Sequence, residues 1–282
     1  MRELLSAGLQ RYRKSLAFWV TLFISLVFGI IAGVITEEDP FHNTEITYFV
    51  GLFLTIAIQI SLMIGIEFSN GVIRNKLMIG HSKVTVFFSE LLLSLISTTL
   101  QFLVFYGAFA VFTARIYSAI AATDMILFVI GLWLLHMSFA VICTAVCYFI
   151  PYYTALAAIL NIVMVLVMMF VCSELHQKLN ELEYNRYGVY DDDKGEFVYE
   201  RNPNAIPHDS AKYALLHTAN YLMPYGQLLD YEEAIDYQQF ERSFMLFDDK
   251  IDELKTAPLC SFLVIGAFTA AGFISFRKRD LK

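Results

Sequence analysis

The sequence predicts an all-α polytopic membrane protein with six transmembrane helices. Hydrophobic residues make up 57% of its 282 positions, charged residues only 17%, and the mean hydropathy is +0.57. Apolar runs of about twenty or more residues recur along the chain, and each is long enough to cross a hydrocarbon core of roughly 30 Å. Basic residues gather at the two ends, whereas acidic residues gather in one long polar segment. Together these features exclude an ordinary soluble domain.

Six runs have the length and composition of membrane spans. The boundary between the fourth and fifth is the least obvious, because Met125 to Val171 is almost continuously apolar. Pro151 supplies the break, since proline cannot continue a helix that precedes it and the aromatic residues around it favour the membrane interface. The predicted spans are 16–35, 46–66, 87–112, 124–149, 152–172 and 257–276.

The distribution of charge predicts the orientation. Four basic residues precede the first span and four follow the sixth, so both termini are expected in the cytoplasm by the positive-inside rule. Two cytoplasmic ends require an even number of spans, which supports six. The loop 36–45 is acidic and is expected outside, whereas the loop 67–86 carries three basic residues and is expected inside.

Residues 1–15 predict an interfacial amphipathic helix. Leu4, Leu5, Leu9, Tyr12 and Leu16 fall toward one side, and Arg11 and Lys14 fall toward the other. The alternative is a basic flank that only orients the first span. A cleavable signal peptide is disfavoured because five further spans follow.

The segment 173–256 holds eighteen acidic and eight basic residues and is predicted to be an extracellular cap of mixed α and β structure. Leu175, Leu179 and Leu182 continue the helical period beyond span five. Alternation over 187–200 predicts a β-hairpin, and helical pattern returns from about 210 to 254 with an interruption at 223–226. The domains expected are therefore a transmembrane domain at 1–172, the cap at 173–256, and the sixth span with its basic tail at 257–282.

The loop between spans two and three is unusual, because it predicts a short amphipathic helix at about 69–80 on the cytoplasmic face. It runs Glu67-Phe68-Ser69-Asn70-Gly71-Val72-Ile73-Arg74-Asn75-Lys76-Leu77-Met78-Ile79-Gly80-His81-Ser82-Lys83. A soluble partner could contact such a helix, so it is the first candidate functional site.

Two ionisable residues fall inside predicted spans, where such groups are costly and are functional candidates by default. Glu90 lies near the cytoplasmic start of span three, and the simpler alternative is an interfacial carboxylate paired with Lys83 or Lys76. His136 lies near the middle of span four, and the simpler alternative is a neutral imidazole bonded to a neighbouring helix.

Catalytic and metal-binding motifs are not found in the sequence. It contains no phosphate-binding G-x-x-x-x-G-K-[ST] and no metal-ligand spacing, so neither enzyme activity nor a bound metal is expected in this chain. The four cysteines are expected to act as small apolar side chains. A disulfide between Cys172 and Cys260 is the alternative, provided that side of the membrane is oxidising.

The pattern Glu67-x-x-x-Gly71-x-x-Arg74-Asn75-Lys76-Leu77-x-x-Gly80-x-Ser82-Lys83 resembles the ABC-2-type permeases, the membrane subunits of bacterial ATP-binding-cassette exporters. The six spans and the closing Phe276-Arg277-Lys278-Arg279 are also similar to that family. Val72 departs from the threonine that is frequent there, and Glu90 departs from a common lysine.

The resemblance implies a dimer of permeases, homomeric or heteromeric, each bound by a separate ATPase subunit that supplies ATP and Mg²⁺ chemistry. The helix at 69–80 would be the coupling helix, with Ile73 and Leu77 anchoring it in the ATPase, Arg74 and Lys76 pairing with acidic groups there, and Glu67 tying it to span two. Its cargo would be an amphipathic peptide, an antimicrobial or a lipid-like molecule. The full set of implied coupling residues is Glu67, Gly71, Ile73, Arg74, Lys76, Leu77, Gly80 and Lys83.

Two other classes of function remain open from the sequence. One is a membrane receptor or assembly protein that binds a ligand through the cap and does not transport. The other is a carrier driven by an ion gradient, which is expected to show more acidic groups inside its spans than this chain has.

Overall fold

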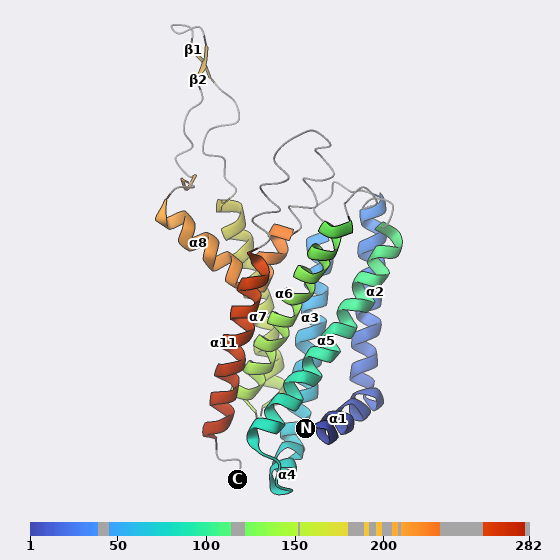
Figure 1. Cartoon of the computed structure of the whole chain (residues 1–282). Helices are drawn as coiled ribbons and strands as arrows, with labels where there is room; N and C mark the ends of the chain where they lie inside the picture. Colours follow the sequence, from blue (N-terminus) through green and yellow to red (C-terminus); the bar gives the residue numbers. More distant parts are fainter. Residues whose placement is uncertain are drawn as a thin grey trace.

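Six long helices form the body of the protein. The structure is a computed structural model that describes residues 1–38, 45–113, 122–151, 153–179, 189–191, 196–198, 205–207, 210–231 and 256–279 (Figure 1). All six helices are long and apolar enough to cross a membrane. Even the shortest, with 22 residues, is about 33 Å long at 1.5 Å per residue. They are α2 (Leu16–Glu38), α3 (Glu45–Ser69), α5 (Lys83–Thr113), α6 (Ala122–Phe149), α7 (Thr154–Leu179) and α11 (Ala257–Lys278).

Each predicted span coincides with one of these helices, which confirms the six-helix, membrane-like architecture. The largest differences are at the start of α5, which begins at Lys83 instead of 87, and at the end of α7, which reaches Leu179 instead of 172. The break at Pro151 is also confirmed, because α6 ends at Phe149 and α7 begins at Thr154. Of the predicted continuation of α7, Leu182 lies outside the described residues.

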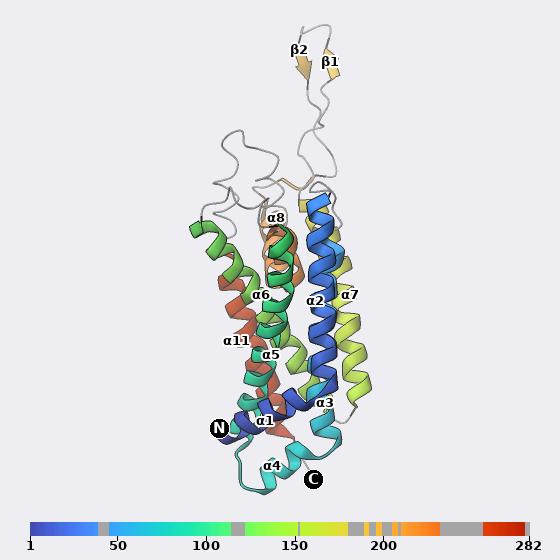
Figure 2. The ribbon, with the colours of Figure 1, turned by 90° about the vertical axis from the view of Figure 1, so that its right-hand side faces the viewer.

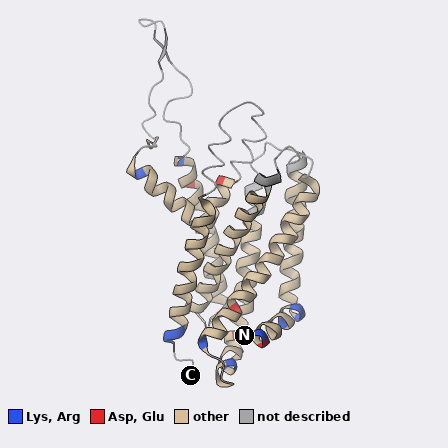
Figure 3. Ribbon diagram, in the orientation of Figure 1, with Lys and Arg blue, Asp and Glu red and all other residues tan. Residues whose placement is uncertain are grey.

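Helices α3 and α6 are the most enclosed, and α7 and α11 are the least. Large apolar side chains such as Phe23, Phe170 and Phe262 are exposed on the outer helices. Exposed apolar groups at these positions are what a helix surface in contact with lipid tails requires. The long helices carry few charges between their ends, and Lys and Arg gather at the end of the bundle that holds the N-terminus (Figure 3).

Close contact between α2 and α5 depends on small residues. A Cβ placed on Gly29 would lie 2.4 Å from the backbone oxygen of Phe105, and one placed on Gly33 would lie 3.1 Å from that of Phe109. One turn before Gly29, the hydroxyl of Ser25 lies 3.2 Å from that of Thr55 on α3. Glycine and hydroxyl residues therefore let three backbones approach, as is typical of helix packing in membranes.

Helix α1 (Arg2–Lys14) crosses the end of the bundle instead of continuing α2 (Figures 1 and 2). Its buried stripe is Leu4, Gly8 and Tyr12, spaced four apart, and Gly8 lies directly against Leu93 of α5. The predicted apolar face was wrong in part. Leu9 is 44% exposed, because the side of α1 that packs on α5 is rotated from the expected one. Leu16, which is 78% exposed, is the first residue of α2 and not part of α1.

The region between α7 and α11 is described only in pieces. Strands β1 (Val189–Asp191) and β2 (Glu196–Val198) pair antiparallel, and the predicted turn between them lies outside the described residues. Helix α8 (Ala211–Leu222) is capped by Ser210, whose hydroxyl accepts a bond from the Tyr213 N–H. A second short helix covers 224–231, so the predicted interruption is a break at Met223 before Pro224. The predicted helical pattern over 232–255 lies outside the described residues.

Candidate functional site

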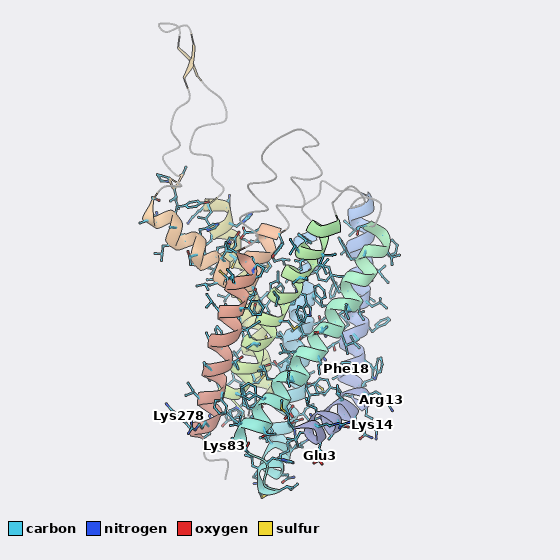
Figure 4. The ribbon with its side chains drawn as sticks, viewed as in Figure 1. Glu3, Arg13, Lys14, Phe18, Lys83 and Lys278 are labelled. Atoms are coloured by element: carbon cyan, nitrogen blue, oxygen red, sulfur yellow. The ribbon has the colours of Figure 1, made fainter. Side chains whose placement is uncertain are left out.

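Helix α4 (Val72–Met78) is the feature that the sequence singled out. It joins α3 to α5 at the end of the bundle where α1 and the end of α11 also lie (Figures 1 and 2). Arg13, Lys14, Lys83 and Lys278, from three different elements, are spread across this end (Figure 4). A seven-residue helix is too short to be stable alone, so its shape depends on the turns and contacts around it.

Two glycines of the motif fix these turns. Gly71 has φ +67° and Gly80 has φ +103°, in the range that other residues adopt only with strain. Past the end of α4, the Gly80 N–H donates to the Leu77 carbonyl at 3.1 Å and the His81 N–H donates to the Lys76 carbonyl at 3.2 Å. This pair of bonds is a Schellman motif, which stops the helix and satisfies its last carbonyls.

Behind α4 lies a cluster of four charges from four helices, which we call the four-charge cluster: Arg11 of α1, Glu67 of α3, Lys76 of α4 and Glu90 of α5. The Lys76 Nζ lies 2.8 Å from Glu67 Oε2 and 2.6 Å from Glu90 Oε1. Arg11 pairs with Glu67 and lies 3.7 Å from Glu90 Oε2. Two positive and two negative charges meet, so the cluster is neutral when all four groups are ionised.

The carboxylates of this cluster are buried. Glu67 and Glu90 are each 1% exposed, whereas Lys76 is 13% exposed and Arg11 is 32% exposed. Taking a carboxylate out of water costs several kcal/mol unless a cation and hydrogen bonds replace the water. Each carboxylate therefore depends on its cations, and the loss of one cation leaves a negative charge uncompensated.

Burial also affects the groups beside these carboxylates. It lowers the pKa of the Lys76 amine, and the attraction of Glu90 opposes that shift. Burial raises the pKa of the Tyr12 phenol, and the Glu90 charge raises it further. Tyr12 therefore stays protonated beside the cluster, and the Glu90 carboxylate helps Lys76 to keep its proton.

The cluster corrects the expected role of Lys76. Lys76 does not face a partner, because its amine is directed inward to Glu67 and Glu90. The prediction that Glu90 pairs with Lys76 or Lys83 is confirmed for Lys76. Glu67 does tie α3 to α4, but through the Lys76 side chain and not through the first turn of α4.

Lys83 is likewise engaged within the chain. Its amine donates to the carbonyl oxygens of Arg277 at 3.1 Å and Arg279 at 2.6 Å, at the end of α11. A cation at these carbonyls satisfies groups that the helix leaves open and complements its dipole. Lys83 therefore joins the start of α5 to the end of the last span.

The apolar residues of α4 that are buried and those that are exposed differ from the prediction. Ile73 is 1% exposed and packs in the core of this chain, and Leu77 is half-buried against the same core. Ile73 therefore has no surface left to anchor a partner, because the core of the bundle extends to the inner face of α4, whereas Leu77 keeps part of its surface exposed. The exposed apolar residues are Met78 at 68% and Ile79 at 80%, and Arg74 is exposed beside them.

His136 is buried within the bundle. Its Nδ1 lies 2.6 Å from the Leu132 carbonyl of its own helix, and its ring stacks on Phe53 at 5.0 Å between centroids. The predicted bond to a neighbouring helix was therefore wrong for Nδ1, because the carbonyl one turn earlier is closer. Its ring also meets that of Tyr106 edge-on, at 5.8 Å between centroids, and no ion pair to His136 is found in the described part of the chain.

The cysteines are free thiols. The alternative of a Cys172–Cys260 disulfide is therefore wrong. The Cys172 thiol instead donates to the Met223 sulfur at 3.4 Å. Within the described ranges, no three His, Cys, Asp or Glu side chains are placed to hold a metal ion.

The sequence reasoning missed two parts of the site. Arg11 was assigned to the polar side of α1, and only the packing of α1 on α5 brings it to Glu67. The exposure of Met78 and Ile79 was not predicted, because apolar side chains on an amphipathic helix are expected to face the core.

In comparisons with known proteins, no family model matches this chain, and no match was found among curated proteins.

Proposed function

We propose that this chain is the membrane-spanning permease subunit of an ATP-binding-cassette exporter. It moves an amphipathic substrate, such as a peptide, an antimicrobial or a lipid-like molecule, out of the cell. A separate ATPase subunit hydrolyses ATP with Mg²⁺, and a second permease, identical or different, completes the transporter. The chain lies in the cell membrane with both termini, α1 and α4 on the cytoplasmic side.

The observation that carries this proposal is the two-sided construction of α4. Its outer side presents Arg74, Met78 and Ile79 to solvent, whereas its inner side holds Ile73 and Lys76 inside the bundle. An exposed pair of apolar residues beside a cation is suited to a groove on a soluble partner. A surface patch alone does not indicate what kind of partner binds it. This patch is attached to the membrane-spanning helices through the inner side of α4, which favours a partner that moves the spans.

The inner side of α4 explains how a movement there would reach the membrane. Lys76 connects α4 to α3 through Glu67 and to α5 through Glu90, and Arg11 connects the same carboxylates to α1. Lys83, at the start of α5, connects to the end of α11. A push on α4 would therefore act on four further helices through buried or half-buried contacts.

The arrangement of the chain ends supports the proposed orientation. The N-terminus, α4 and the end of α11 lie at one end of the bundle, as six crossings require (Figure 1). Basic residues gather at the same end (Figure 3). The positive-inside rule then favours the cytoplasm for this end. The segment between α7 and α11 would form the extracellular α+β cap.

Purification from the native host in mild detergent tests the proposal. We expect the wild-type chain to bring down a soluble P-loop ATPase in near-stoichiometric amount. The double variant Met78→Asp/Ile79→Asp should lose this ATPase, because two carboxylates would replace the apolar contact. Leu215→Asp is the matched control, since Leu215 is 71% exposed on α8 at the other end of the bundle.

Two results would overturn the proposal. One is a folded wild-type chain that is reproducibly purified alone, which would favour a receptor or assembly protein that binds its ligand through the cap. The other is an ATPase that binds the Met78→Asp/Ile79→Asp variant as well as it binds wild type, which would remove α4 as the docking element.

A further inference from the structure

The spans contain buried polar side chains that the proposed coupling does not use. Between α2, α3 and α5 these are Thr21, Ser25, Thr55, Gln59, Ser94, Ser97, Thr98 and Gln101, each less than 5% exposed. In a membrane bundle such groups need a hydrogen-bonding partner, because lipid offers none.

Most of the hydroxyl groups find this partner in their own helix. Ser25 donates to the Thr21 carbonyl at 2.9 Å, Thr55 to the Leu52 carbonyl at 2.8 Å, and Ser97 to the Ser94 carbonyl at 2.9 Å. Serine and threonine can reach the carbonyl three or four positions earlier, so their burial costs little. These residues are explained by helix packing alone.

Gln59 and Gln101 are different. They are 1% and 0% exposed, and neither the amide nitrogen nor the amide oxygen of either side chain has a hydrogen-bond partner within the described part of the chain. The Thr98 hydroxyl, one turn before Gln101 on α5, is in the same condition. A buried amide without a partner costs about 1–3 kcal/mol by mutational measurements, and two such amides are a large liability for one bundle.

The helix contacts bring these residues to one place. Gln101 is one turn before Phe105, whose carbonyl lies against Gly29 of α2, so Gln101 falls at the level of Ser25. Ser25 in turn touches Thr55, and Gln59 is one turn after Thr55 on α3. Since α3 runs antiparallel to α2, Gln59 falls at the level of Thr21, about one turn from Gln101 and close to the level of Thr98. The three residues therefore lie within about one turn of one another along the bundle, where α2, α3 and α5 meet.

We propose that Gln59, Thr98 and Gln101 form an uncharged hydrogen-bonding site inside the bundle, which takes neutral ligands that carry amide or hydroxyl groups. This proposal does not depend on the exporter assignment.

The chemistry of the site sets its selectivity. An amide side chain donates and accepts, and a hydroxyl does the same, so the three residues can pair with another amide or hydroxyl in either direction. No ionisable side chain is among them to neutralise a charged ligand, and a charge left unpaired in the bundle costs far more than a neutral polar group. Neutral ligands are therefore accepted and charged ones are excluded.

Replacing glutamine by methionine tests the site with thermal melting in detergent. Methionine keeps the length of the side chain and removes its polar atoms. For Gln59→Met and Gln101→Met we expect a Tm equal to or above that of wild type, because no protein group loses a partner.

Gln227 provides the matched control. It is equally buried, but its amide donates to the Tyr221 carbonyl at 2.6 Å and accepts from the Ser261 hydroxyl at 2.8 Å. Gln227→Met should therefore lower Tm. If Gln59→Met and Gln101→Met lower Tm as much as Gln227→Met does, the two glutamines are paired within the protein and the proposed site does not exist.

Thiol labelling tests access to the site directly. In Gln101→Cys we expect the neutral reagent 2-hydroxyethyl methanethiosulfonate to modify position 101 at least about tenfold faster than the buried Cys143 and Cys147 of the same sample, as read by peptide mass spectrometry. The trimethylammonium analogue should not reach this rate. Ile56→Cys, at a 0% exposed apolar position of α3, controls for access created by shortening a side chain.

Three labelling results would overturn the proposal. Equal labelling of Ile56→Cys would show that the substitution itself opens the core. Equal labelling of Gln101→Cys by the cationic reagent would remove the selectivity for neutral ligands. A rate at position 101 no faster than at Cys143 and Cys147 would show a closed core.

Discussion

Replacing Lys76 by methionine is the sharpest test of the four-charge cluster. The substitution keeps most of the aliphatic stem and removes the ammonium that lies 2.8 Å from Glu67 and 2.6 Å from Glu90. Glu67 keeps its pair with Arg11, whereas Glu90 keeps only the longer contact of 3.7 Å to the same guanidinium. A buried carboxylate would then be left with too little compensation.

The expected loss follows from the number of contacts. Two charge-assisted hydrogen bonds disappear, each contributing about 1.5–3 kcal/mol. Removing one partner of a buried ion pair typically costs about 3–5 kcal/mol. Because Lys76 is 13% exposed and water can replace part of the lost contact, we expect the lower end, about 3 kcal/mol of unfolding free energy.

A second substitution that restores charge balance separates the electrostatic part of the loss from the packing part. In Lys76→Met/Glu90→Gln one positive and one negative charge remain, in Arg11 and Glu67, so we expect the double variant to recover at least half of the loss. Arg74→Met is the matched control. It removes an exposed cation from the same helix and should change stability by less than about 0.5 kcal/mol.

The assay is denaturant or thermal unfolding in one detergent, followed by the aromatic signal, with all four proteins prepared in parallel. Wild-type stability in Lys76→Met would refute the reasoning about buried charge. A double variant no more stable than the single one would show that the loss comes from packing of the lysine stem.

Three further predictions concern contacts between helices and the turn that ends α4. Gly29→Ala should cost about 1–3 kcal/mol, because the added methyl meets a backbone oxygen of α5, whereas Gly107→Ala has open space and should be neutral or stabilising in the same melting assay. Gly80→Ala should cost about 1–2 kcal/mol through strain at φ +103°, and an unchanged Tm would contradict the role of this turn. Lys83→Met should lower the free energy of unfolding by about 1 kcal/mol and increase hydrogen exchange at the end of α11. Unchanged exchange there would show that this contact does not hold the end of the helix.

The membrane spans could be predicted because their signal is local. Length, apolar composition and a proline such as Pro151 fix a helix and its end wherever the rest of the chain lies. Helix α1 was predicted in position but not in rotation. Its buried stripe contains Gly8, which no hydrophobic pattern selects, and Gly8 is inside only because Leu93 of α5 packs on it.

The four-charge cluster could be predicted only in part. Glu67, Lys76 and Glu90 are close in sequence, so an ion pair between two of them could be predicted. Arg11 is 56 positions before Glu67, and its charge served equally well as a marker of topology. The direction of Lys76 was decided by tertiary packing, because a lysine on an amphipathic helix can face water or a buried carboxylate at the same sequence position.

A final prediction separates the contribution of the four-charge cluster to stability from its proposed role in coupling ATP hydrolysis to the spans. In Lys76→Met/Glu90→Gln the charge balance returns, but the link from α4 to α5 does not, because glutamine and methionine form no strong pair. If α4 passes the movement of an ATPase to the spans, the double variant should regain much of its Tm and still show low substrate-stimulated ATP hydrolysis with its bound ATPase. A double variant with wild-type stimulation would mean that the cluster only holds the fold and that the movement passes through Ile73 and the core behind it. Both outcomes can be read from the same preparation, because Tm and ATP hydrolysis are measured independently.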